Sequence, residues 1–69
     1  MEIFGKRIKE LLVKNGISQK ELADRLHVGR TTLCEWLNNH NEPSMQTIVD
    51  IANIFDVSTD YLLGRTEDY

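Results

Sequence analysis

The spacing of apolar and helix-breaking residues is the feature that most restricts the fold of this chain. Apolar residues recur three and four positions apart, and nowhere do they alternate strictly with polar ones as in a half-buried strand. Turn-forming residues at 15–16, 27–29, 38–43 and 64 divide this pattern into short segments. Because helices shorter than about 12 residues are marginal alone, these segments must pack together as an all-α fold.

Serine marks the expected start of three of these helices. The chain has three serines, Ser18, Ser44 and Ser58, and each precedes a helical pattern as an N-cap does. The run from Ser18 to Glu21 has the form of a capping box, in which the Ser18 hydroxyl accepts from the Glu21 amide and the Glu21 carboxylate reaches back. We therefore expect a single compact domain over 1–69, with five helices: one ending at Asn15, then 19–26, about 30–38, 45–55 and 59–63.

Composition argues against several other classes of protein. A chain with one cysteine, Cys34, forms no intramolecular disulfide and no multi-cysteine zinc site, and His27 and His40 lie on separate loops without a ligand at metal-binding spacing. We see no paired acids, glycine-rich phosphate loop or activated nucleophile, and so expect neither an enzyme nor a cofactor, metal or small-molecule substrate.

The N-terminal residues mix charged with apolar side chains, unlike a signal peptide, and no apolar run approaches the roughly 18 residues of a membrane span. We therefore expect a cytoplasmic protein with no membrane partner.

The net charge of −3 conceals an uneven distribution along the chain. Residues 1–30 hold seven basic and four acidic side chains, a net charge of +3, whereas residues 31–69 hold one basic and seven acidic, a net charge of −6. Because attraction to phosphate depends on local charge, the acidic total does not exclude a nucleic-acid partner. The alternative is that both halves simply expose solvated helix faces.

Residues 19–38 have the pattern of two short helices joined by a tight turn. A small residue, Ala23, stands in the first helix, the turn falls at 27–29, and the bulky Leu33 and Trp36 stand in the second. Helices that cross steeply need a small side chain where their axes approach and large ones that fix the second helix to a core. This arrangement leaves the first turn of the second helix exposed, able to enter a major groove about 12 Å wide.

Several short runs of the chain occur together in one known family: Phe4-Gly5, Ile17-Ser18-Gln19-Lys20-Glu21-Leu22-Ala23, Trp36, Glu42-Pro43-Ser44 and Val57-Ser58-Thr59-Asp60-Tyr61-Leu62-Leu63. In this combination the chain resembles the phage repressor and Cro-like (XRE-type) helix-turn-helix family over nearly its whole length. The resemblance implies a five-helix, lambda-repressor-like domain that binds double-stranded DNA in a sequence-specific way. It further implies a transcriptional regulator, which we expect to be a repressor, acting as a homodimer on a palindromic operator.

The resemblance also implies roles for individual residues. The positions that read bases are Arg30, Thr31 and Glu35, and those that contact phosphates are Gln19, Thr32 and Asn38. Arg30 could bind guanine O6 and N7, bind a phosphate, or only pair with Asp24. Glu35 could accept from the amino group of cytosine, but phosphates would repel it.

The chain departs from the family pattern at four places, one of which is Gly29 in place of the usual serine cap of the third helix. His27 occupies a turn position at which the family usually has glycine, so we expect a positive φ there. Asn39 replaces the glycine that commonly ends the third helix, which asparagine tolerates. Leu12 and Leu37 stand where many members have a buried arginine–glutamate pair, and since two apolar residues can replace such a pair without loss, we predict that they touch.

The helix expected at 45–55 has more apolar residues than one face can hold, and Ile54 points away from the others. This surplus predicts a homodimer interface formed by Ile54, Val57, Tyr61 and Leu62. Burial of this helix between the first and fifth helices is the alternative.

A second functional hypothesis keeps the fold but makes it a protein-interaction module, such as an antitoxin or anti-repressor partner that binds through its acidic half.

Overall fold

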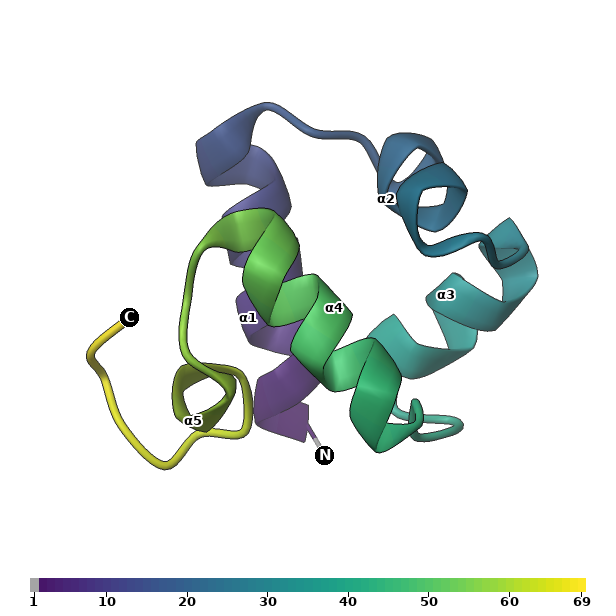
Figure 1. Ribbon diagram of the computed structural model, residues 1–69. Helices are drawn as coiled ribbons and strands as arrows, with labels where there is room; N and C mark the ends of the chain where they lie inside the picture. Colours follow the sequence, from purple (N-terminus) through teal and green to yellow (C-terminus); the bar gives the residue numbers. More distant parts are fainter. Residues whose placement is uncertain (1) are drawn as a thin grey trace.

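The computed structural model describes residues 2–69, and five α-helices are its only regular elements within that range. They are α1 (Glu2–Asn15), α2 (Gln19–Leu26), α3 (Arg30–Leu37), α4 (Met45–Phe55) and α5 (Thr59–Leu62). Figure 1 shows α1 and α4 in the middle of the molecule, with α2 and α3 together on one side and α5 with the C-terminal segment on the other. The all-α prediction is therefore confirmed. No helix within residues 2–69 is long and apolar enough to cross a membrane.

Local hydrogen bonds explain why the helices begin where the serines predict. The hydroxyls of Ser18, Ser44 and Ser58 each accept from a backbone amide three residues later, at 3.0, 3.2 and 3.0 Å. The second half of the expected capping box is wrong, because the Glu21 carboxylate accepts from Arg25 Nη2 at 2.7 Å instead. An arginine one turn later on the same exposed helix face offers this carboxylate a charged partner.

Residues in the left-handed conformation follow the ends of the helices. His27 has φ 58°, as predicted from its place in the turn, and the next amide, Val28 N, donates to the Ala23 carbonyl at 3.1 Å. Asn39 has φ 64°, also as predicted, and Asp56 ends α4 in the same way with φ 56°. The reversal at His27 brings α3 against α2, which is the geometry that a helix-turn-helix requires.

Side chains from all five helices form one buried cluster. Its largest fully buried members are Phe4, Ile8, Leu22, Leu33, Ile51 and Leu62. Trp36 belongs to the cluster and is only 8% exposed, which confirms it as a core residue. Leu12 and Leu37 are also buried in the cluster while α1 packs against α3, so their direct contact stays a prediction that this packing favours.

Arg7 is buried, although it counts among the basic residues of the N-terminal half. Its Nη1 donates to the carbonyls of Tyr61 and Thr66, both at 2.6 Å, and its Nη2 lies 2.9 Å from a carboxylate oxygen of Glu67. The guanidinium also lies 4.2 Å from the centre of the Tyr61 ring. Arg7 therefore holds the C-terminal segment against α1, and its charge does not reach an external phosphate.

Candidate nucleic-acid interface

The helix α3 is buried on one side and open to solvent on the other. Leu33, Trp36 and Leu37 enter the core, whereas the exposed residues of the helix and its C-cap are Arg30, Thr31, Cys34 and Asn38. The turn at 27–29 and the packing of α2 against α3 fix this orientation (Figure 1). The base-reading helix predicted from the sequence thus presents its first turn outward.

Arg30 is exposed and takes part in none of the ion pairs found among residues 2–69. Asp24, which was its alternative partner, instead lies 3.3 Å from Lys20 Nζ. Gly29 caps α3 without a side-chain hydrogen bond. The guanidinium can therefore reach a ligand that approaches this face of the helix without first breaking an ion pair.

The remaining predicted positions of α3 differ in exposure. Thr31 is exposed, whereas Thr32 and Glu35 are half-buried. Cys34, for which the sequence pattern indicated no role, is exposed. At about 100° of rotation per residue, Cys34 lies on the same face of the helix as Arg30 and Asn38. The i, i+4 spacing of these three residues is the sequence signal that places Cys34 on the outward face.

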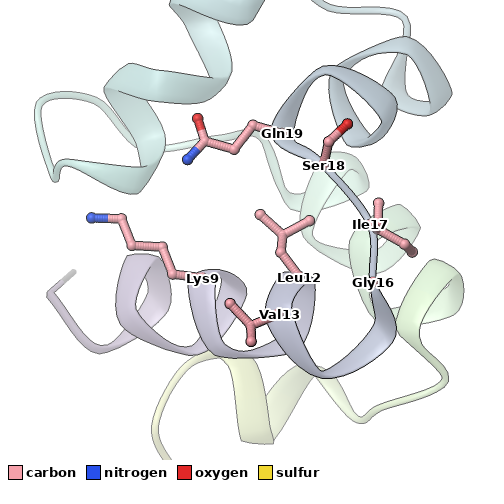
Figure 2. Close-up of a pocket in the computed structure, with 7 residues that line it drawn as sticks. All are labelled: Lys9, Leu12, Val13, Gly16, Ile17, Ser18 and Gln19. Carbon is pink, nitrogen blue, oxygen red and sulfur yellow. The ribbon is translucent and has the colours of Figure 1, made fainter.

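A second group of polar residues surrounds an open depression of about 480 Å³ at the junction of α1 and α2. Figure 2 shows the side chains of Lys9 and Gln19 extending toward the same opening from these two helices. Gln19 was predicted as a phosphate contact at the start of α2, and its exposed position agrees with that role. Lys9 was not predicted, because only the tertiary structure brings α1 to this place.

Asn38 joins α1 to the end of α3. Its Oδ1 lies 3.5 Å from Lys9 Nζ, and its Nδ2 donates to the Cys34 carbonyl at 2.9 Å and to Cys34 Sγ at 3.2 Å. Asn38, which was predicted to contact a phosphate, is thus exposed but already hydrogen-bonded to Lys9 and Cys34.

Few cations in the basic half of the sequence are free. Arg7, Lys20 and Arg25 pair with carboxylates, and Lys14 contacts the ring and hydroxyl of Tyr69. Among residues 2–30, the basic side chains without such a partner are Lys6, Lys9 and Arg30. Of the seven basic side chains counted in residues 1–30, three are therefore free to meet a polyanion.

The predicted homodimer residues do not form one surface. Leu62 is fully buried and Tyr61 is 8% exposed, so both belong to the core of the single chain and offer almost no surface to a second copy. Both are buried because α5 packs against α1, where the Arg7 guanidinium lies over the Tyr61 ring, and an interface that includes them stays a prediction that their burial does not favour. Ile54 and Val57 are half-buried and keep some exposed surface.

Comparisons with known proteins agree with this geometry. A family model described as helix-turn-helix matches residues 8–62. The chain is 41% identical over 64 residues to the HTH-type transcriptional regulator ImmR of Bacillus subtilis (strain 168), covering 93% of this chain and 50% of ImmR. It is 38% identical over 62 residues to the SPbeta prophage-derived uncharacterized HTH-type transcriptional regulator YopO of the same organism, covering 90% and 89% of the two chains.

A solved structure has a similar fold. The N-terminal DNA binding domain of SinR from Bacillus subtilis superposes with a TM-score of 0.81 at 31% identity, covering 91% of this chain and 93% of that one. The chain thus spans nearly all of that domain, although it spans only half of the length of ImmR.

Proposed function

This chain belongs to the helix-turn-helix family, and on that premise we propose that it binds double-stranded DNA as a transcriptional regulator. The observation that carries the proposal is the outward first turn of α3, where Arg30 is exposed and free of ion pairs within the described chain. A helix that is held in place by its buried face and exposed to solvent on its opposite face can enter a major groove about 12 Å wide. The relatives named as transcriptional regulators support the same role.

Each exposed group can make one kind of DNA contact. The Arg30 guanidinium has a planar set of donors that matches guanine O6 and N7, and Thr31 beside it can offer a methyl group to thymine or a hydroxyl to a base edge. Glu35, which is half-buried, can accept from a cytosine amino group. Gln19 and Thr32 can donate to phosphate oxygens, which positions the helix without reading sequence.

Replacing Arg30 by alanine should weaken binding to the preferred duplex about 5- to 150-fold, the equivalent of about 1–3 kcal/mol for one bidentate contact. It should also relax the choice of base at one position of the site. Selection of bound sites from random duplexes would identify the preferred duplex and the base preference at each position. Fluorescence anisotropy titration of both proteins would then measure the change in affinity.

The control is Arg65→Ala, because Arg65 is another exposed arginine, 3.9 Å from Asp60 and far along the chain from α3. This variant should bind as the unaltered protein does. Equal affinity and unchanged site preference for Arg30→Ala would contradict the role of Arg30. If no duplex sequence binds better than bulk DNA at low salt, sequence-specific binding itself is wrong.

We also propose that the chain binds DNA as a homodimer, with two α3 helices about 34 Å apart in successive major grooves. The half-exposed Ile54 and Val57, at the end of α4 and just after it, support an apolar contact there. Ile54→Lys should convert the dimer into a monomer, as measured by sedimentation equilibrium. Val13→Lys is the control, since Val13 is 84% exposed on α1. An unaltered protein that is monomeric both free and on the duplex would exclude the dimer.

A further inference from the structure

Two polar side chains, Lys9 and Gln19, line the α1–α2 depression, and Asn38 contacts one of them, Lys9. Lys9 comes from α1, Gln19 from the start of α2 and Asn38 from the residue that follows α3. Figure 2 shows Lys9 and Gln19 pointing to the same opening. Lys9 is the only charged residue among those that line the depression, and no carboxylate in the described part of the chain forms an ion pair with it. The mouth of this depression therefore has an uncompensated positive charge.

The hydrogen bonds of Asn38 decide which of these groups can bind an anion. An asparagine amide has two N–H donors and one carbonyl acceptor. Its Nδ2 already donates to the carbonyl and the sulfur of Cys34, and its Oδ1 faces the ammonium of Lys9. A phosphate offers only acceptors, so Asn38 has no donor left for it. The Lys9 ammonium has three donors and uses one.

The position of this group relative to α3 fits the backbone of a bound duplex. Asn38 and Arg30 are eight residues apart in sequence, which corresponds to about 12 Å along a helix. That distance is close to the width of the major groove. With Arg30 at the base edges, we therefore expect the far end of α3 and the neighbouring Lys9 to lie near a strand at the edge of the groove.

The other residues that line the depression explain why its cation has to come from Lys9. Leu12, Val13 and Ile17 are apolar, and Ser18 and Gln19 are neutral. Leu12 also stands at the position for which the family resemblance predicts an arginine. Lys9 is one helical turn before Leu12, so it projects over the same side of α1.

We propose that this depression receives a DNA backbone phosphate, with Lys9 as its charged contact, Gln19 as a neutral donor and Asn38 as a positioning residue. Asn38 holds the Lys9 ammonium beside the end of α3, so that base reading and phosphate binding occur in one fixed geometry. This inference rests on the proposed DNA binding and goes beyond it by assigning Lys9 to the phosphate contact in place of Asn38.

The test measures binding of a short mixed-sequence duplex over a series of salt concentrations. Lys9→Met should reduce the slope of log K against log salt by about 0.9, the contribution of one phosphate contact. Lys6→Met is the matched control, because Lys6 is an exposed lysine of the same helix that lines a different depression with Arg7 and Glu67. The control removes the same charge and should leave the slope unchanged.

A double-mutant cycle tests the positioning role of Asn38. Asn38→Ala should weaken binding in the unaltered background but have little further effect when Lys9 is already methionine, because it acts through Lys9. Circular dichroism and thermal melting of each variant would show that the fold is retained. Additive effects of the two substitutions would assign Asn38 a separate contact with DNA and overturn its positioning role.

The remaining outcomes separate this inference from the function on which it rests. If the unaltered protein binds the duplex and the slope of Lys9→Met is the same as its own, the phosphate site is wrong and DNA binding stands. Equal reductions of the slope by Lys6→Met and Lys9→Met would also overturn the site, since they would reflect total charge. If the unaltered protein fails to bind any duplex at low salt, both the function and the site are wrong.

Discussion

Replacing Gly5 by alanine should lower the free energy of unfolding by about 2 kcal/mol, because an overpacking cost of about 3 kcal/mol exceeds the roughly 1 kcal/mol that alanine gains as the better helix former. A Cβ built on Gly5 would overlap the backbone carbonyl of Leu37, at the end of α3. A backbone carbonyl cannot turn away as a side chain can. The helices α1 and α3 would therefore have to separate, which would loosen the packing of Leu37 and Trp36. Urea unfolding followed by circular dichroism would measure the loss.

The size of this effect is large relative to the stability of so short a chain. A domain of 69 residues has a total stability of about 3–10 kcal/mol. Separation of α1 and α3 would also move α3, the helix proposed to read the bases. We therefore expect the Gly5→Ala protein to bind DNA more weakly under conditions in which it remains folded.

The control is Gly29→Ser, which adds a side chain at another glycine. Gly29 has φ −75°, and no atom lies within 4 Å of its built Cβ. Serine is also a good residue for the N-cap position that Gly29 occupies. This variant should be as stable as the unaltered protein or slightly more so. If Gly5→Ala is equally stable, α1 and α3 do not approach as closely as the structure shows.

The close approach of Gly5 to Leu37 illustrates which parts of the fold a sequence can predict. The helix starts at Ser18, Ser44 and Ser58 and the reversal at His27 depend on bonds between residues a few positions apart, and the sequence predicted them. The reason for a glycine at position 5 lies thirty-two positions away, in the backbone of Leu37. No local pattern contains that contact.

The candidate site divides in the same way. The exposure of Arg30 and Thr31 follows from the helical period and the buried Leu33 and Trp36, so the sequence could place them. The pairing of Lys9 with Asn38 joins two helices, and no sequence pattern indicated a role for Lys9. Leu62 has the apolar character of an interface residue, and only the packing of α5 shows that it is buried within the chain.

Arg7→Met should destabilise the protein by about 3 kcal/mol, the second large effect that we expect. Methionine keeps an apolar stem but leaves the Tyr61 and Thr66 carbonyls without the charged donor that each accepts from at 2.6 Å. Hydrogen bonds to a charged group contribute about 1.5–3 kcal/mol each, and the contact with the Tyr61 ring is lost as well. Thermal and urea unfolding would measure the change.

Glu67→Gln separates these bonds from the ion pair. The Glu67 side chain is 91% exposed, so solvent screens its attraction to Arg7, and this variant should lose less than about 1 kcal/mol. Equal losses in Arg7→Met and Glu67→Gln would instead place most of the energy in the ion pair. An Arg7→Met protein as stable as the unaltered one would contradict the anchoring role altogether.

The same variant also tests how charge is used in this chain. If every cation in residues 1–30 attracted DNA equally, removing Arg7 would reduce the salt dependence of binding as much as removing Lys9. Because the Arg7 side chain is 7% exposed and bonded to the C-terminal segment, we expect no change in the salt slope at temperatures where Arg7→Met is folded. A slope reduced by about 0.9 would mean that the Arg7 charge reaches the duplex after all. An unchanged slope would show that the Arg7 charge takes no part in the attraction to DNA, so that free cations such as Lys9 and Arg30 would have to supply it.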